Sequence, residues 1–424
     1  MAKKQQILQS VPLVAIDLGS HSVRAMAAEL TENNMLRILG VESSSKFPCV
    51  ERGIVCNTSN AGYTINEILK FLSNRIHVES LPSAFVCVGG RTMQVVPVCS
   101  KRDQVRKREV TQQLLDEMEK ECKQKVEAHN SDVAVLDLVP YYYKLDGVEQ
   151  DEQPTIEQRA AQIEAHFMAF VGKKDLEQKV IDSFNRSGKR MEHAYVRPDA
   201  LLNVLTTEED TTKGCAILDL GAQTTTLTVY KGNQYLYNKV VPQGGYDITR
   251  DIEQLGISLA YAESLKCKYG FASPNLVQKD QRFRIPAVEP TRGEIIITSS
   301  ELATIISNRL AQIINPLVDK LNSEDERFGV LYITGGGAML QGILQYIQSK
   351  TNIPVMYGSH AAWLTPDTPD EMCMPTYSAL VGTLLLGASY RKAHPIATPN
   401  DNRKKIIDFL TEKTLEIFTE QSGY

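Results

Sequence analysis

The sequence lacks the patterns of several common classes of protein. Its eight cysteines are scattered and form no CxxC pair, which argues for a reducing compartment and against a zinc site or a disulfide framework. No apolar run is long enough to span a bilayer, and the N-terminal stretch MAKKQQILQSVP lacks the apolar core of a signal peptide. The absence of GxxxxGK[ST] excludes ordinary Walker chemistry. The seven histidines are dispersed, and no convincing Ser/His/Asp or Cys/His set occurs.

The composition is that of an ordinary globular protein. The 424 residues, 42% hydrophobic and 23% charged, are enough for two to three domains. The net charge of −5 does not indicate a nucleic-acid binder. One basic run, Lys101 to Arg108, holds five basic residues and one acid, and we interpret it as a solvated strand–helix junction, with a nucleic-acid patch as the alternative.

Hydrophobic periodicity predicts two similar halves separated by an insert. Each half begins with a three-strand meander, and a small α/β insert from about 93 to 172 contains a charged helix from 109 to about 127. The expected strands are 14–18, 23–30, 35–43, 84–88, 192–196, 215–220, 225–230, 235–241 and 330–334. The expected helices are 61–76, 176–184, 246–255, 258–269, 299–321, 375–393 and 402–421.

One motif occurs in both halves. Asp17-Leu18-Gly19 and Asp219-Leu220-Gly221 each follow an apolar run and precede small or hydroxylated residues. A strand–turn–strand of this composition exposes successive backbone N–H groups, which bind phosphate oxygens. The aspartate at the end of each strand could hold the waters of a Mg²⁺ ion shared with the phosphates. Two such hairpins facing each other predict a polyphosphate site.

A third glycine-rich turn follows a later strand. In YITGGGAMLQG, from Tyr332 to Gly342, a strand enters three glycines and a helix follows. Without side chains, this turn can lie flat against a base or a ribose. Alone it is a weak signal, because such turns also occur for packing, but it strengthens the prediction made from the two hairpins.

The two hairpins and the late TGGG turn resemble the actin–Hsp70–sugar-kinase superfamily. Within it, the chain resembles the FtsA family of bacterial cell-division proteins over nearly its whole length, in VPQGGYDITRDI, AYAESLKCKYG, SSELATIISNRLAQII, YITGGGAMLQG and PTYSALVGTLLLG. The resemblance implies an α/β, actin-like fold of two duplicated RNase H-like domains around a nucleotide cleft, with an FtsA-type insert.

The resemblance also implies domain boundaries. The expected parts are 1–90 (first domain, first part), 91–172 (insert), 173–205 (return to the first domain), 206–374 (second domain), 375–394 (connecting helix), 395–401 (linker) and 402–424 (amphipathic helix).

By the same resemblance, ATP and Mg²⁺ are the expected cofactors. The first phosphate loop is expected to comprise Asp17, Gly19, Ser20, His21 and Ser22. The second is expected to comprise Asp219, Gly221, Ala222, Gln223, Thr224 and Thr225, with Asp17 and Asp219 at the metal. The nucleoside side is expected to comprise Gly244, Gly245, Glu263, Lys266, Gly335, Gly336 and Gly337.

Two departures from the superfamily affect this expectation. The second loop reads GAQT where the superfamily usually has GGGT, so the pocket is less permissive there. Arg197 stands at about the place where Hsp70 proteins have the glutamate that helps to position the attacking water. We therefore expect tight nucleotide binding with slow hydrolysis, because phosphoryl transfer needs an oriented nucleophile.

The implied function is that of a self-assembling membrane adaptor for the division ring at the cytoplasmic face of the cell membrane. Its expected partners are FtsZ, further copies of itself, other division proteins and membrane lipids, and no nucleic acid. By the resemblance, Arg282, Arg284 and Arg292 lie in a segment that corresponds to the FtsZ-binding part of FtsA, and they are the expected contacts with FtsZ. The alternatives are a pilus-assembly protein like PilM and a sugar-kinase-like phosphotransferase, for which no catalytic carboxylate is assignable apart from Asp17 and Asp219.

The C-terminal segment predicts an amphipathic helix. On a helical wheel one face carries large apolar residues, and the basic residues Arg403, Lys404 and Lys405 precede it. The alternative is a helix that folds back on the protein body. The face comprises Ile406, Ile407, Leu410 and Ile417, with Phe409 and Phe418 at its margin.

Overall fold

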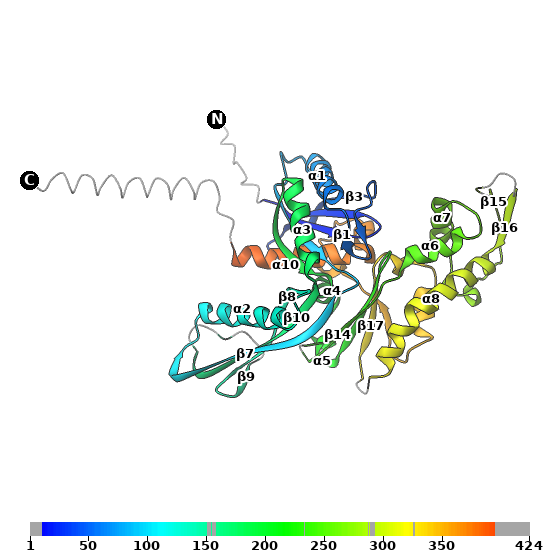
Figure 1. Cartoon of the computed structure of the whole chain (residues 1–424). Helices are drawn as coiled ribbons and strands as arrows, with labels where there is room; N and C mark the ends of the chain where they lie inside the picture. The colour runs from blue at the N-terminus through cyan, green and yellow to red at the C-terminus, as the bar shows by residue number, and fades with distance from the viewer. Residues whose placement is uncertain are drawn as a thin grey trace, which may run out of the picture.

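The computed structural model describes residues 11–150, 154, 158–232, 234–286, 288, 293–324 and 327–394. In Figure 1 the first domain lies at the top centre, the second domain at the right, and the insert at the lower left. The predicted helix from 402 to 421 lies outside the described residues.

The first domain is built on a five-stranded sheet in the order β11-β6-β1-β2-β3. Its strands are β1 (Leu13–Leu18), β2 (Val23–Leu30), β3 (Leu36–Ser44), β6 (Ser83–Val88) and β11 (Arg190–Val196). The first three form an antiparallel meander, and β6 and β11 continue parallel to β1. The remaining elements are β4 (Val50–Glu51), β5 (Ile54–Val55), α1 (Thr58–Arg75), α3 (Lys174–Ser187) and α4 (Arg197–Leu205).

Helix α1 shows how local sequence sets these elements. Ile65, Ile68, Leu69 and Leu72 recur at helical spacing and are buried against the sheet. The helix begins at Thr58, three residues before the predicted start, because the Asn57 side chain accepts a hydrogen bond from the backbone N–H of Asn60 and caps it.

The second domain repeats the sheet topology of the first. Its order is β14-β13-β12-β17-β18, again a meander of three strands followed by parallel neighbours. The elements are α5 (Glu208–Lys213), β12 (Cys215–Leu220), β13 (Thr225–Lys231), β14 (Gln234–Val241), α6 (Gly245–Glu253), α7 (Leu259–Tyr269), η1 (Pro274–Leu276), β15 (Arg282–Pro286), β16 (Glu294–Thr298), α8 (Ser299–Asn322), β17 (Val330–Thr334), η3 (Gly336–Met339), α9 (Ile343–Gln348), β18 (Val355–Tyr357), η4 (Ala361–Trp363), η5 (Asp370–Cys373) and η6 (Pro375–Tyr377).

The insert is a four-stranded sheet in the order β7-β10-β8-β9, packed on one helix. Its elements are β7 (Gln94–Glu109), α2 (Gln112–His129), β8 (Val133–Leu145), β9 (Val148–Gln150) and β10 (Arg159–Lys173). A separate small core fills the space between α2 and the sheet, with Leu115 and Met118 facing Ile163. At the base of the insert, the Phe170 ring packs against Tyr235 of β14 at 4.9 Å between centroids.

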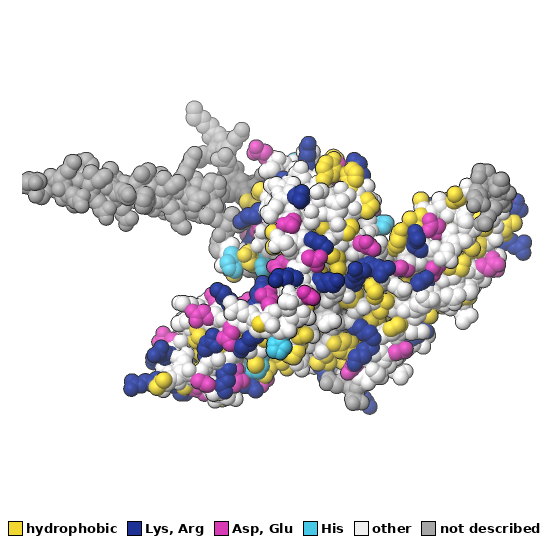
Figure 2. Space-filling view, in the orientation of Figure 1, with side chains coloured by type: hydrophobic (Ala, Val, Ile, Leu, Met, Phe, Trp, Pro, Cys, Tyr) yellow, Lys and Arg dark blue, Asp and Glu magenta, His cyan; other side chains and the backbone are white. Residues whose placement is uncertain are grey.

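The basic run of the insert lies inside β7, so the prediction of a strand–helix junction was wrong: the strand continues to Glu109 and α2 begins at Gln112. Three of its five basic residues pair with acids. Lys101 pairs with Glu164 at 3.4 Å, Lys107 pairs with Asp146 at 2.8 Å, and Arg102 pairs with Glu121. Figure 2 shows basic and acidic side chains interspersed over this face of the molecule. These contacts favour the solvated interpretation of the run.

Helix α10 (Ser378–Ala393) returns the chain from the second domain to the first, where it packs on β1 and α4. Nine of its residues are buried, and most of them are small. Gly382 lies directly against α4, because a Cβ atom added there would be 1.9 Å from the carbonyl oxygen of Ala200. The small residues of α10 thus allow two helix backbones to approach closely.

We predict that Gly382→Ala lowers the free energy of unfolding by about 2–3 kcal/mol, since overpacking forces the two helices apart. Thermal unfolding followed by circular dichroism measures the change. Ser389→Ala, at an exposed position of the same helix, is the matched control and should be nearly neutral. Equal melting temperatures for Gly382→Ala and the control would contradict the close contact.

Candidate functional site

A cavity of about 290 Å³ lies between the two domains, where the three predicted glycine turns meet. Every predicted nucleotide-binding residue lines it except Gln223. Asp17 and Asp219 lie at equivalent places, each near the carboxyl end of the strand that is central in its sheet. This is the position at which α/β sheets bind ligands.

The two hairpin turns require glycine for the same reason. A Cβ atom on Gly19 would be 2.8 Å from the carbonyl oxygen of Ser22. The corresponding atom on Gly221 would be 2.6 Å from the carbonyl oxygen of Thr224. Both turns therefore close so tightly that no side chain fits at their first residue. The repeated motif of the sequence is a repeated backbone geometry.

The second hairpin is fixed to the start of α6. The backbone N–H of Gly245 donates to the carbonyl of Gly221 at 3.0 Å, and that of Tyr246 donates to Ala222 at 2.7 Å. A Cβ atom on Gly244 would be 2.4 Å from the Gly221 oxygen, so this approach also needs glycine. These contacts join the start of α6 to the second hairpin turn at the cavity wall.

The third glycine-rich turn, which begins at Gly335, packs against Asp219. Gly335 has a φ of +83°, a conformation that favours glycine. A Cβ atom there would be 2.4 Å from Oδ1 of Asp219. By contrast, the nearest atom to a Cβ on Gly336 is Oγ1 of Thr376 at 4.0 Å. Gly336 therefore borders open space on the cavity side.

Glu263 and Lys266 form a polar cluster on α7 beside this turn. The Lys266 ammonium donates to Glu263 at 2.7 Å, and to the Gly245 carbonyl and the Thr249 hydroxyl at 2.8 Å each. Burial opposes the charge on Glu263, but Lys266 and the hydrogen bonds lower the pKa of this carboxyl below its ordinary value. The pair holds the start of α6 in place at the cavity wall.

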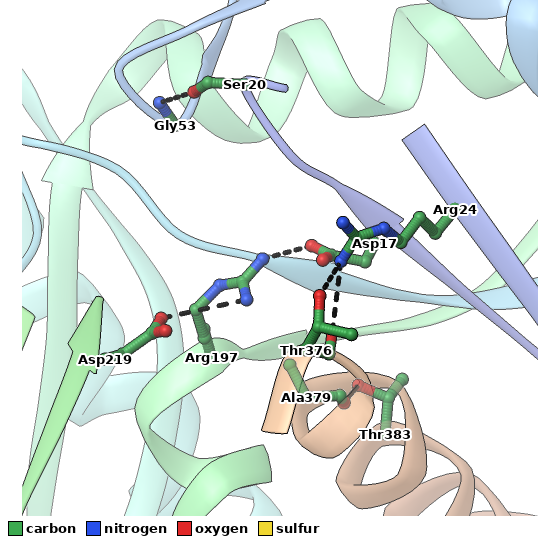
Figure 3. Close-up of polar contacts among 9 residues, drawn as sticks. All are labelled: Asp17, Ser20, Arg24, Gly53, Arg197, Asp219, Thr376, Ala379 and Thr383. Atoms are coloured by element: carbon green, nitrogen blue, oxygen red, sulfur yellow. Dashed lines mark hydrogen bonds and ion pairs between the residues drawn. The ribbon is translucent and has the colours of Figure 1, made fainter. Parts of the chain in front are cut away.

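The charged centre of the cavity is Arg197, at the start of α4. Its guanidinium donates from Nη2 to Oδ1 of Asp17, and its Nη1 lies 3.8 Å from Oδ2 of Asp219 (Figure 3). Burial opposes its charge, but the two carboxylates raise the pKa of Arg197 above its ordinary value. Burial raises the pKa of Asp219 above its ordinary value, and the positive charge of Arg197 counteracts part of this rise. Arg197 is therefore a permanent cation between the two aspartates.

This arrangement does not fit a resident Mg²⁺ ion held by the two aspartates. The Arg197 guanidinium occupies the space between Asp17 and Asp219, the two residues that would hold the ion, and Asp219 is also confined by the turn at Gly335. Within the described part of the chain, no three His, Cys, Asp or Glu residues cluster so as to hold a metal ion.

Sequence reasoning missed several residues of the cavity. Arg24 lies opposite Asp17 in the β1–β2 register, and its Nη1 donates to the Thr376 hydroxyl at 2.6 Å (Figure 3). Both line the cavity, although 352 residues separate them in the chain. The hairpin register could have indicated Arg24, but no local signal indicates Thr376.

Gln223 lies outside the cavity lining because its side chain contacts the opposite domain. Its Oε1 accepts a hydrogen bond from the backbone N–H of Arg52 at 2.9 Å. The Ser20 hydroxyl accepts one from the neighbouring N–H of Gly53 at 3.0 Å. Both loops therefore contact the same turn between β4 and β5, which links the two domains across the cleft.

The predicted partner-binding arginines lie far from this cavity. Arg282 and Arg284 are exposed on β15, at the outer end of the second domain (Figure 1), while Ile285 of the same strand is buried. Arg284 has a loose contact with Glu294 at 4.0 Å. Arg292 and the predicted membrane residues, Ile406, Ile407, Phe409, Leu410, Ile417 and Phe418, lie outside the described residues.

Comparisons with solved structures identify the fold. A chain of the PilM–PilN type IV pilus biogenesis complex matches with a TM-score of 0.63 and 16% identity, over 88% of this chain and 98% of that one. MreB 5 of Spiroplasma citri bound to AMPPNP matches with a TM-score of 0.55 and 13% identity, over 91% and 98%. The duplicated sheets and the cleft between them define an actin-like protein.

Comparisons with known sequences show which group of actin-like proteins the chain resembles. A family model described as "Cell division protein FtsA" matches residues 216–382. The FtsA of Streptococcus pneumoniae is 24% identical over 80% of this chain and 74% of its own length. The FtsA of Borreliella burgdorferi is 23% identical over 93% of this chain and 95% of its own length. The FtsA of Escherichia coli K12 is also 23% identical, over 88% of this chain and 90% of its own length. This chain is similar in sequence to the FtsA cell-division proteins and has an actin-like fold, which confirms the resemblance seen in its sequence.

Proposed function

We propose that this chain is an ATP-binding cell-division protein that self-assembles on the cytoplasmic face of the membrane and tethers the FtsZ ring. The observation that carries the proposal is the cavity in which two equivalent hairpin turns and the Gly335 turn meet. The similarity to FtsA proteins, and to an actin-like protein solved with AMPPNP, supports the same assignment.

The nucleotide is expected to lie with its phosphates between the two hairpins. The backbone N–H groups of the Gly19 and Gly221 turns would face the phosphate oxygens, and Gly335 to Gly337 would border the nucleoside. Arg197 accepts no proton at neutral pH, so it cannot act as a general base. Slow hydrolysis therefore remains our expectation. Calorimetric titration of the full chain with ATP tests the proposal, and one saturable site is the expected result.

The contact with FtsZ is proposed for the outer end of the second domain. Arg282 and Arg284 point away from the buried side of β15, so they are available to an acidic partner segment. We propose Arg292 as a third contact, from the sequence alone. An exposed ion pair such as Arg284 with Glu294 costs little to break, at roughly 0–1 kcal/mol, so a partner can displace it.

Membrane attachment is proposed for the C-terminal segment, outside the described residues. Among the helices that the structure describes, none is both long and apolar enough to cross a bilayer. The apolar face predicted for residues 406–418 would lie in the lipid interface, with the preceding basic residues at the headgroups.

Self-assembly is proposed to use the insert. A head-to-tail contact between copies yields open filaments unless its rotation closes a ring. The insert extends away from the cleft (Figure 1) and has a core separate from those of the two main domains. It can therefore contact a neighbouring copy without altering the nucleotide cavity.

We predict that removing the outer insert abolishes filaments and leaves ATP affinity unchanged within about twofold. Cys99 and His166 are cross-strand partners on β7 and β10, so a two-residue turn can replace residues 100–165. This cut retains Met93, Met168 and Phe170, which pack in the core of the first domain, and removes Leu136, Val139 and Tyr141 of β8, which pack at its edge. Electron microscopy with ATP measures assembly, and calorimetry shows whether the cleft is intact. Filaments of unchanged appearance would exclude the insert as an interface.

A further inference from the structure

The charges that line the cleft are balanced by the protein itself. Three carboxylates, those of Asp17, Asp219 and Glu263, face three cations, Arg24, Arg197 and Lys266. Glu263 and Lys266 form a direct pair. Two aspartates without a counter-charge would repel a phosphate chain, and a divalent cation normally removes that repulsion. Here the cations are arginines on β2 and α4.

The placement of Arg197 makes it a substitute for the metal. It contacts Asp17 and lies 3.8 Å from Asp219, so its charge is centred between the aspartates of the two phosphate loops. Its side chain passes over the turn after β6, where a Cβ atom on Gly89 would be 3.5 Å from Nε. The side chain remains 22% exposed, so the guanidinium is reachable from the cavity.

Arginine has the hydrogen-bonding capacity for this role. A guanidinium carries five N–H donors and binds phosphate in a fork-like geometry. Among the described residues, the bond to Asp17 is the one hydrogen bond of the Arg197 side chain, and Nη1 lies 3.8 Å from Asp219, beyond hydrogen-bond distance. The guanidinium therefore has donors left for a phosphate oxygen.

We propose that the cleft binds a nucleoside polyphosphate without an obligatory divalent cation, because Arg197 supplies the positive charge between Asp17 and Asp219. This inference rests on the proposed nucleotide-binding function and changes the form of nucleotide that the cleft accepts: the free polyphosphate as well as its magnesium complex.

The first arm of the test compares ATP binding by the unaltered full chain in excess MgCl₂ and in excess EDTA, by calorimetry. The two dissociation constants should agree within about threefold. Binding in MgCl₂ alone would overturn this inference and leave the proposed function intact. No binding in either buffer would overturn both.

The second arm removes the charge with Arg197→Gln. In EDTA its affinity should fall at least about tenfold relative to MgCl₂, the loss expected for one charge-assisted hydrogen bond. Arg197→Lys retains the cation and should bind ATP in both buffers. Arg190→Gln is the matched control. It makes the same change at an exposed position, the first residue of β11, and should behave like the unaltered chain.

Circular dichroism melting establishes that each variant is folded before titration. If Arg197→Gln binds ATP in EDTA as tightly as the unaltered chain, Arg197 does not replace the metal and the inference is wrong. If the Gln variant binds in MgCl₂ alone while the Lys variant binds in both buffers, the charge of the side chain accounts for the difference.

Discussion

Gly336→Arg is expected to weaken ATP binding at least about a hundredfold. A Cβ atom fits at this position, with its nearest neighbour, Oγ1 of Thr376, 4.0 Å away. The rest of the arginine side chain then has to project from the turn into a cavity of about 290 Å³. It takes the volume proposed for the nucleoside without disturbing the backbone that holds the turn. Calorimetric titration with ATP measures the effect.

Three further variants separate the causes of such a loss. Gly336→Ala adds the Cβ atom alone and should bind nearly as the unaltered chain does. Gly336→Gln is bulky and uncharged, so it distinguishes volume from charge. Gly335→Ala places a Cβ atom 2.4 Å from Asp219 Oδ1 and should destabilise the fold itself. Unchanged ATP affinity in Gly336→Arg would show that the nucleoside site is misplaced.

Phe409→Glu combined with Ile406→Glu is expected to release the protein from lipid vesicles. Complete burial of each large apolar side chain contributes roughly 1.5–3 kcal/mol, whereas each basic residue near an anionic surface contributes about 1 kcal/mol. Acidic residues also balance the basic ones within this segment, so attachment has to rely on apolar area. Co-sedimentation of the full chain with vesicles, with and without ATP, measures binding.

The matched control places the same two charges on the opposite side of the predicted helix, in Leu415→Glu with Thr419→Glu, and should retain most of the binding. Lys404→Ala with Lys405→Ala should weaken binding and reduce its dependence on salt. Full vesicle binding by the Phe409 and Ile406 double variant would instead favour a helix that folds back on the protein. No vesicle binding by the unaltered full chain would favour the pilus-assembly alternative, for which the solved structures give a shared fold at 16% identity and nothing more.

Much of the local structure is predictable because it follows from short-range pattern. Strand β2 has the predicted limits, 23 to 30, since apolar and small residues occupy six of its eight positions and a turn bounds each end. The ends of α1 and α10 were less accurate. The cap at Asn57 and the short helix at 375–377, which precedes α10, depend on a few hydrogen bonds. Hydrophobic periodicity does not predict such bonds.

The sequence by itself determined that two equivalent hairpins would exist, because a tight turn needs glycine, and Gly19 and Gly221 occur at the same place in two matching strand patterns. Only the tertiary structure decided what their aspartates meet. Arg197 lies 180 residues from Asp17 in the chain and 22 from Asp219, and Arg24 meets Thr376 across 352 residues. Such contacts depend on how whole sheets pack against each other, which no local spacing encodes. That Arg197 is the cation between the two aspartates could therefore be seen only in the folded structure.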